Sequence, residues 1–149
     1  MQDFKNLTVW HAARWLAKSI YQLTALLPES ERFGLSSQMR RASISICSNI
    51  AEGCGRRGDR EFRRFLNVAM GSACELESEL ILCLDLSLIA AAPQQEGLRG
   101  LTETKRMICG LINRLSDPAV NVRRRRSSER ELTTESRELT LSREPRTEN

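Results

Sequence analysis

Two helical patterns separated by glycines, between residues 33 and 65, constrain the fold of this chain more than any other feature. In the first pattern, apolar or small residues recur at spacings of four and three, which keeps them on one face of an α-helix. These residues are Leu35, Met39, Ala42, Ile46, Ile50 and Gly53. Gly53, Gly55 and Gly58 break the pattern, and a second helical pattern starts behind Asp59, a good N-cap residue. The segment therefore predicts a helical hairpin, with Gly53 at or just past the end of its first helix.

Similar patterns predict two more helices, so that four follow one another along the chain. The first runs from about residue 7 to 27 with Asn6 as its cap, the third continues to about residue 89, and the fourth starts near Pro93. Their core positions are Val9, Ala13, Leu16, Ile20, Leu23 and Leu27; Phe62, Leu66, Ala69, Ala73, Leu76, Leu80 and Cys83; and Leu98, Leu101, Ile108, Leu111 or Ile112, and Leu115. Short connections favour an all-α, antiparallel up-down-up-down four-helix bundle over residues 1–116.

Small residues in the third pattern, and apolar residues outside the core positions of the second, indicate further packing. Gly71, Ser72 and Ala73 lie in the middle of the third pattern, where we expect them to let another backbone approach closely. Ile44 and Cys47 give the second helix a second apolar face. A single bundle leaves such faces partly exposed, so we expect self-association.

Residues 117–149 differ in character from the rest of the chain. They are rich in Arg, Glu, Ser and Thr, contain almost no core-forming residues, and repeat RELT at a spacing of seven. Two leucines at this spacing cannot sustain a coiled coil, so we predict a disordered tail. Its basic run, Arg123–Arg126, reads better as a solvated linker than as a phosphate site, because the same tail contains several acidic residues.

The five cysteines and the single His11 do not form a recognisable metal site. Cys47, Cys54, Cys74, Cys83 and Cys109 show no CxxC spacing. Four of them lie within helical patterns, where we expect buried thiols, whereas Cys54 lies between glycines and is expected to be exposed. We expect no metal and no cofactor. No signal pattern or membrane-spanning run is present, which favours the cytoplasm and excludes a membrane partner.

The sequence GCGRRG at residues 53–58 matches the dinucleotide-binding fingerprint GxGxxG letter for letter. That fingerprint requires a preceding β-strand within a βαβ unit, whereas an amphipathic helix precedes the glycines here. We therefore interpret the motif as an interhelical turn.

Arginines surround this turn. Arg56 and Arg57 lie in it, and three more follow on one face of the next helix, whose N-terminus would itself favour a phosphate. With two arginines of the preceding helix, the candidate nucleic-acid-binding residues are Arg40, Arg41, Arg56, Arg57, Arg60, Arg63 and Arg64. The alternative is a solvated charged surface in which arginines pair with Glu52, Asp59 or Glu61. The net charge of +4 is too small to decide between the two.

No catalytic constellation is visible. Glu75, Glu77 and Glu79 alternate along a helix and cannot converge on one site, although Glu75 and Glu79 share a face. Glu75 lies near core positions and is expected to pair with Arg40 or Arg41, or to accept a hydrogen bond from Asn49. The serines have no placed base. We therefore expect a protein that is not an enzyme.

Three stretches resemble a known family. They are FKNLTVWHAARWLAKSIYQLT, FGLSSQMRRASISICSNIAEGCGR and EFRRFLNVAMGSACELESEL, and the likeness runs from residue 4 to about residue 116. They are similar to the large-subunit (23S) rRNA intervening-sequence protein family, also called four helix bundle proteins. The arginine-rich stretch at 56–64 and the long tail depart from the family pattern.

The resemblance implies a four-helix bundle that assembles as a homopentameric ring in bacteria. It also implies similarity to the accessory variability protein of diversity-generating retroelements, which associates with a reverse transcriptase and with nucleic acid. Matching positions that could carry surface chemistry are Arg40, Arg41, Asn49, Glu52, Arg56 and Arg57, although Asn49, Glu52 and Gly53 could instead shape the turn.

These observations favour a non-enzymatic oligomeric scaffold that binds the RNA or DNA backbone, preferably structured RNA or an RNA–protein complex. A ring would repeat the arginine cluster and multiply a weak phosphate contact. Few exposed aromatics argue against base stacking. The alternative is a protein-interaction adaptor, for example an accessory subunit of a reverse transcriptase.

Overall fold

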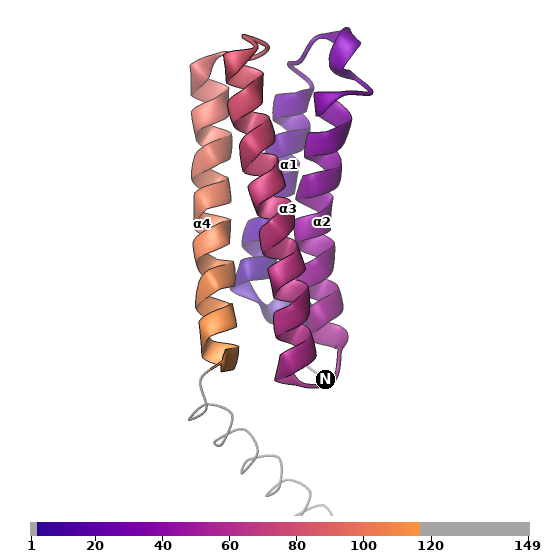
Figure 1. Cartoon of the computed structure of the whole chain (residues 1–149), viewed down its shortest axis with the longest axis vertical. Helices are drawn as coiled ribbons and strands as arrows, with labels where there is room; N and C mark the ends of the chain where they lie inside the picture. Colours follow the sequence, from indigo (N-terminus) through magenta and orange to yellow (C-terminus); the bar gives the residue numbers. More distant parts are fainter. Residues whose placement is uncertain (1–2, 117–149) are drawn as a thin grey trace, which may run out of the picture.

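The computed structural model describes residues 3–116, which form an all-α fold (Figure 1). Its α-helices are α1 (Thr8–Thr24), α2 (Leu35–Gly55), α3 (Asp59–Asp85) and α4 (Ala91–Ser116), with short 3-10 helices η1 (Phe4–Asn6) and η2 (Glu29–Glu31). No strand occurs within residues 3–116, so the predicted fold class is confirmed at this level. The tail predicted for residues 117–149 lies outside the described residues.

The four helices pack side by side, and each one contacts the helices that precede and follow it while α1 also contacts α4. Helices α2 and α3 run in opposite directions, because Gly53 packs against Phe62 near their connection whereas Met39 meets Cys83 far from it. The start of α1 and the α2–α3 connection lie at the same end of the molecule, and the α3–α4 connection lies at the other (Figure 1).

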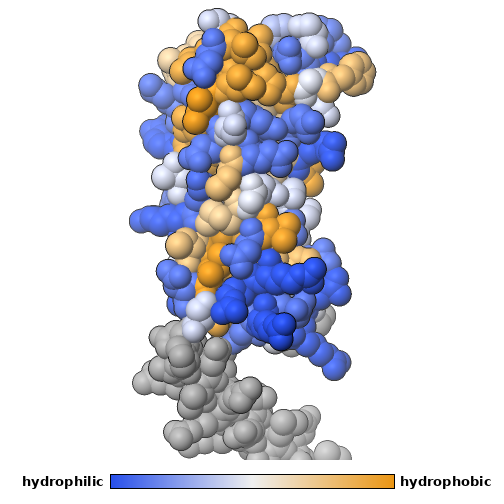
Figure 2. Space-filling view, in the orientation of Figure 1, coloured by the Kyte–Doolittle hydropathy of each residue, from blue (hydrophilic) through white to orange (hydrophobic). Residues whose placement is uncertain are grey.

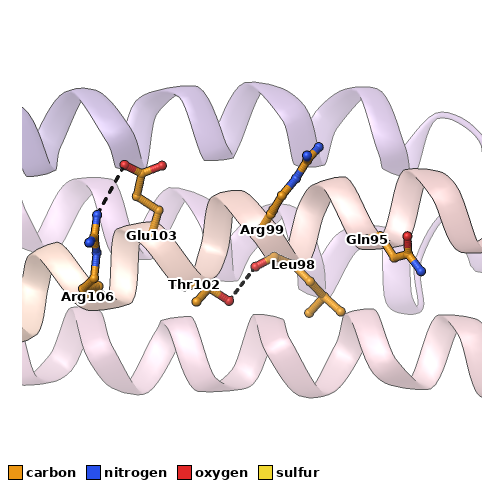
Figure 3. A pocket seen from close by; sticks show the side chains of 6 residues that line it. All are labelled: Gln95, Leu98, Arg99, Thr102, Glu103 and Arg106. Atoms are coloured by element: carbon orange, nitrogen blue, oxygen red, sulfur yellow. Dashed lines mark hydrogen bonds and ion pairs between the residues drawn. The ribbon is translucent and has the colours of Figure 1, made fainter.

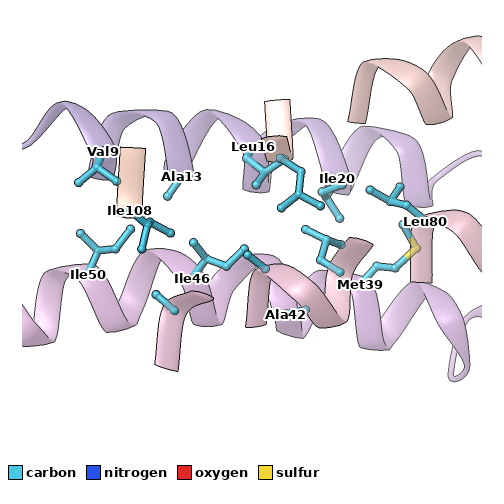
Figure 4. Packing of buried hydrophobic residues seen from close by; sticks show 14 of the residues in the cluster. Val9, Ala13, Leu16, Ile20, Met39, Ala42, Ile46, Ile50, Leu80 and Ile108 are labelled. Carbon is cyan, nitrogen blue, oxygen red and sulfur yellow. The ribbon is translucent and has the colours of Figure 1, made fainter. Parts of the chain in front are cut away.

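The core contains most of the apolar residues predicted from the helical spacing, together with Cys54 and Ile89 (Figure 4). Leu98, which was also predicted, is only partly buried. Ile20, Ile46, Ile50 and Leu80 are completely shielded from solvent, whereas Leu35 is only half-buried at the start of α2. Each such aliphatic side chain contributes about 1.5–3 kcal/mol when it is fully buried. The hydrophobic stripes therefore account for the pairing of the helices.

The ends of the helices around the glycines differ from the prediction. Helix α2 continues through Gly53 and Gly55, and the chain becomes extended only at Arg56. Gly58, with a φ of 90°, is the N-cap of α3, and Asp59 is its first residue. A positive φ is easily adopted by glycine alone, so Gly58 rather than Asp59 reverses the chain.

Two other helix ends also differ. Asn6 lies in η1, which is capped by the side chain of Asp3, and Leu7 is the N-cap of α1. Helix α3 ends at Asp85 instead of continuing to Ile89, because the amides of residues 86–88 bond back to carbonyls of the last turn. Tertiary packing and local caps, rather than the apolar pattern, fix these ends.

The close approach expected at Gly71, Ser72 and Ala73 is not made at Gly71 itself, although Ala73 is buried and the Ser72 hydroxyl lies 2.8 Å from that of Ser45 on α2. Gly71 is exposed, and a Cβ atom there would meet nothing within 4 Å. A Cβ atom on Gly53 would lie 2.6 Å from the Cβ of Phe65 and 2.8 Å from the Cδ2 of Phe62. Helices α2 and α3 therefore lie close together beside the turn.

A search of residues 3–116 finds no helix with the length and apolar character needed to cross a membrane.

Candidate nucleic-acid interface

Five arginines lie in the connection between α2 and α3 and at the start of α3. We call them the arginine corner: Arg56, Arg57, Arg60, Arg63 and Arg64. Figure 2 shows strongly hydrophilic side chains over this lower end of the bundle. All five are exposed except Arg63, which is half-buried. The structure therefore brings together the cluster predicted from the sequence.

Two members of the corner are paired on their own helices. Arg56 donates to the carboxylate of Glu52, and Arg64 lies 3.5 Å from that of Glu61. Both guanidinium groups also lie over the ring of Phe65, at 5.4 and 5.7 Å from its centroid. For these two residues the alternative of a solvated, internally paired surface describes the structure well, since exposed ion pairs of this kind contribute little.

Arg63 has a structural contact. Its Nη1 donates to the hydroxyl of Ser116 at 3.2 Å and so links the start of α3 to the end of α4. Its half-buried position fits this contact.

Arg57 and Arg60 are the free cations of the corner. Both are exposed, and neither forms an ion pair with any described residue. They flank the N-terminus of α3, where Gly58 offers no side chain to cap the first amide groups. Amide groups at a helix N-terminus favour an anion, although Asp59 and Glu61 in the first turn oppose this effect. Two unpaired guanidinium groups at this point can contact phosphates.

Arg40 and Arg41 do not belong to the corner. Sixteen residues of helix separate Arg40 from Arg56, roughly 24 Å at the usual rise per residue. Arg40 instead donates from Nε to the hydroxyl of Thr24 at 2.8 Å and lies 5.0 Å from the ring centroid of Tyr21, both on α1. Arg41 is exposed.

The predicted polar network around Glu75 is absent from the described residues. Glu75 is exposed, Arg40 points to α1, and Asn49 donates to the carbonyl and hydroxyl oxygens of Ser45. The α2–α3 contact is made by the Ser45 and Ser72 hydroxyls, 2.8 Å apart. The prediction failed because helical spacing does not fix the rotation of each helix about its own axis.

Glu79 is a half-buried carboxylate that the sequence did not reveal. Its Oε2 is shielded from solvent and has no hydrogen-bond partner among the described residues. Burial, together with the nearby charge of Glu75, raises the pKa of Glu79 from 4.5 to about 7. Glu77, by contrast, accepts a 2.7 Å hydrogen bond from Lys105, and this contact raises the pKa of the lysine.

The cysteine predictions were partly wrong. Cys54 is buried, because α2 continues past it, whereas Cys74 and Cys109 are exposed on helix surfaces. Cys83 is buried as expected, and Cys47 is half-buried. Burial raises the pKa of the Cys47, Cys54 and Cys83 thiols. Within residues 3–116 no group of three metal-ligating side chains comes together.

A hollow of about 590 Å³ lies along α4 (Figure 3). Its lining residues all come from this one helix: Gln95, Leu98, Arg99, Thr102, Glu103 and Arg106. Thr102 bonds to the carbonyl of Leu98, and Arg106 pairs with Glu103 at 3.9 Å. Because the lining residues all come from one face of one helix, the hollow offers no convergent set of groups for a small molecule.

The expectation of few exposed aromatics was wrong. Trp15, Tyr21 and Phe33 are 56%, 44% and 87% exposed. The sequence signal that was overlooked is WHAARWLAK at residues 10–18, in which aromatic and basic residues interleave. Such interleaving is typical of surfaces that bind nucleic acid.

Fold and surface together define an all-α bundle of four helices with a cationic corner at one helical turn. The sequence matches the family model described as 23S rRNA-intervening sequence protein over residues 5–110, and the chain belongs to this family. No curated protein matches the sequence.

A solved structure with the same fold is a protein of unknown function from the S23 ribosomal protein family of Bacteroides thetaiotaomicron VPI-5482. It is 26% identical to this chain, with a TM-score of 0.66, and the alignment covers 70% of this chain and 98% of the other.

Proposed function

We propose that this protein is a non-enzymatic, cytoplasmic scaffold that binds structured RNA or an RNA–protein complex through the arginine corner. The observation that carries the proposal is the pair of exposed, unpaired guanidinium groups of Arg57 and Arg60 beside the N-terminus of α3. A cation without a carboxylate partner in the protein does not have to break an ion pair before it binds a phosphate. Each phosphate contact also releases counterions, which favours binding. The name of the family, which refers to an intervening sequence in 23S rRNA, agrees with an RNA partner.

The scaffold is proposed to be an antiparallel up-down-up-down bundle that assembles as a homopentameric ring. The family resemblance supports the ring, and so do the exposed apolar residues Ile44 and Val68 on α2 and α3. One corner with two free arginines binds weakly. A ring that repeats the corner converts weak contacts into useful affinity, because later contacts form at high effective concentration.

The test is fluorescence anisotropy of a labelled structured RNA titrated with the full chain across a salt series. Wild-type protein is expected to bind saturably, with an affinity that falls steeply as salt rises. The double substitution Arg57→Glu and Arg60→Glu should weaken binding at least tenfold and flatten the salt dependence, since each lost phosphate contact lowers the slope by about 0.9. Neither side chain supports the packing, so helicity should stay unchanged.

The matched control is Arg99→Glu with Arg106→Glu on α4, which changes the net charge by the same amount away from the corner. Equal weakening by both double substitutions would mean that overall charge, rather than the corner, governs binding. Absence of binding by wild-type protein at low salt would contradict the proposed function.

A protein-interaction adaptor is the second candidate, and the apolar end of α3 favours it. Exposed aliphatic side chains gather there: Ile81, Leu82, Leu84 and Leu86. Figure 2 shows apolar surface over the upper end of the bundle, opposite the corner. Such a patch commonly marks a protein contact, and a reverse transcriptase is one partner of this kind.

The adaptor hypothesis predicts that the protein isolated from its own cells carries a stoichiometric protein partner. Substituting Leu82→Glu and Leu86→Glu should remove that partner and leave RNA binding in vitro unchanged. Retention of the partner by this variant would exclude the patch as its docking site.

A further inference from the structure

Helix α1 carries a surface that the arginine corner does not explain. The helix contains no Asp or Glu over its whole length, yet it presents Arg14 and Lys18 to solvent. It lies at the back of the view in Figure 1. A helix of this length normally pairs some of its cations with carboxylates three or four residues away. On α1 the cations are placed beside aromatic rings instead.

The cations and rings follow one another along the helix. The guanidinium of Arg14 lies 5.6 Å from the ring centroid of Trp10 and 5.9 Å from that of Trp15, and the ammonium of Lys18 lies 4.9 Å from Trp15. Farther along, Arg40 of α2 lies over Tyr21. We call these residues the aromatic–cationic face: Trp10, Arg14, Trp15, Lys18, Tyr21 and Arg40.

Trp15 is the exposed centre of this face. The indole is 56% exposed, whereas Trp10 is half-buried against Phe4, with ring centroids 4.8 Å apart. An exposed tryptophan does not contribute the stabilisation that burial of its large apolar surface would give. The two neighbouring cations cover part of the indole and leave the rest free for a flat apolar partner.

The face begins at the same end of the bundle as the arginine corner. Asp3, just before η1, is close enough to Cys54 at the end of α2 for its charge to raise the pKa of that thiol. Arg14 acts in the same way, with opposite sign, on Cys47 of α2. The foot of α1 and the corner therefore lie at the same end of the bundle, where α1 packs against α2 and α2 packs against α3. A strand that passes the foot of α2 can continue along α1 without meeting a carboxylate of this helix.

We infer that the aromatic–cationic face binds unpaired nucleotides, with a base stacked on Trp15 and the flanking phosphates held by Arg14 and Lys18. The face and a nucleic-acid strand are complementary: the phosphates can contact the row of cations, and the flat bases can stack on the rings between them. A protein partner would have to be strongly acidic as well as aromatic or apolar. The inference rests on the proposed function and adds to it the kind of nucleic acid that is recognised, namely single-stranded segments next to structure.

The experiment compares an oligouridylate of about ten nucleotides with a blunt RNA duplex of similar length. Binding of the full chain to each is measured by anisotropy. Trp15→Leu should weaken binding of the oligouridylate by about tenfold, because base–aromatic stacking has roughly this effect per base, and should leave the duplex unchanged. Trp15→Phe keeps a ring and should restore most of the affinity. Because Trp15 is exposed, both variants should retain wild-type helicity.

Phe33→Leu is the matched control. Phe33 is also an exposed ring beside an arginine, with Arg32 5.4 Å from its centroid, but Arg32 is paired with Glu29. This substitution should leave binding of both RNAs unchanged. A second readout is the emission of Trp15 in the Trp10→Phe variant, which the oligouridylate should quench saturably.

The outcomes separate this inference from the proposed function. If Trp15→Leu has no effect, or weakens both RNAs equally, while Arg57→Glu with Arg60→Glu weakens both, the corner stands and stacking on Trp15 is refuted. If Trp15→Leu instead changes the mass of the protein in solution, the face is a contact between copies and the inference is overturned. If wild-type protein binds neither RNA at low salt, both proposals fail.

Discussion

At the scale of single residues, Glu79 is a carboxylate whose half-buried environment raises its pKa. One carboxylate oxygen is buried without a hydrogen-bond partner in the described part of the chain, and the pKa is raised to about 7. A carboxyl group whose pKa is higher in the folded state than in the unfolded state binds a proton on folding. Its contribution to stability is therefore complete below the unfolded pKa of about 4.5 and is lost as pH rises through about 7.

Replacing Glu79 with Gln should remove the free-energy cost of keeping an ionised, half-buried carboxylate in the folded protein at high pH. We expect the variant to be more stable than wild type at about pH 8 by about 1 kcal/mol, a value discounted because the group is partly exposed to solvent. The difference should shrink toward zero at about pH 4, below the unfolded pKa of 4.5, where the carboxyl group is protonated in both the folded and the unfolded state. Urea unfolding at both pH values measures the effect. Glu96→Gln, at an exposed position of α4, is the control for the loss of one carboxylate.

Sequence reasoning is weakest at this scale, because burial of one side chain depends on the rotation of its helix. Glu75 was expected to lie near the core positions, and Glu79 was noted only as sharing its face. In the structure Glu75 is exposed, whereas Glu79 is half-buried with one oxygen shielded from solvent. Cys54 was expected in an exposed loop and lies in the last turn of α2. By contrast, the arginine corner was predictable, since clustering of charge around a turn needs no knowledge of helix rotation.

At the scale of the helices, the α2–α3 pair depends on one small residue. Gly53 is buried against Phe62 and Phe65, and an alanine Cβ there would come within 3 Å of both side chains. Gly53→Ala should therefore force the helices apart near the arginine corner and destabilise the protein by about 1–3 kcal/mol. Thermal or urea unfolding measures the change.

Gly71→Ala is the matched substitution in an open position. It places the same methyl group in the middle of α3, where no atom lies within 4 Å. The gain in helix propensity should stabilise the protein by about 0.5–1 kcal/mol. Two stabilising results would refute the close packing at Gly53. Destabilisation by Gly71→Ala would instead indicate that a second copy covers α3 at this point.

The helices themselves followed from their apolar spacing. The predicted core positions of α1 and α3 are all buried, because a stripe that repeats at three and four residues has only one way to leave water. The ends were less predictable. Both Gly58 and Asp59 are acceptable N-cap residues of α3 by their residue type, and in the structure the cap is Gly58. The outcome depends on how closely α2 and α3 pack, which the sequence does not state.

At the scale of the whole molecule, the proposed function depends on repetition. Among residues 3–116 of one chain, Arg56, Arg63 and Arg64 are engaged by internal contacts, which leaves Arg57 and Arg60 without an ion-pair partner in this range. Two phosphate contacts give weak binding at physiological salt. A ring of identical subunits would place the same two cations at regular intervals, so an RNA long enough to reach several corners gains affinity without any new kind of contact.

A ring with repeated corners should bind RNA with an affinity that depends on the length of the RNA. A hairpin that reaches one corner should bind weakly, whereas a structured RNA that spans several corners should bind about 10²- to 10⁴-fold more tightly. Arg57→Glu with Arg60→Glu should cost more on the long RNA than on the hairpin, because every subunit of the ring loses its contacts at once. Anisotropy titrations give the affinities, and sedimentation equilibrium gives the number of subunits. A monomeric mass, or equal affinity for the two RNAs in an oligomer, would contradict the ring as the source of binding strength.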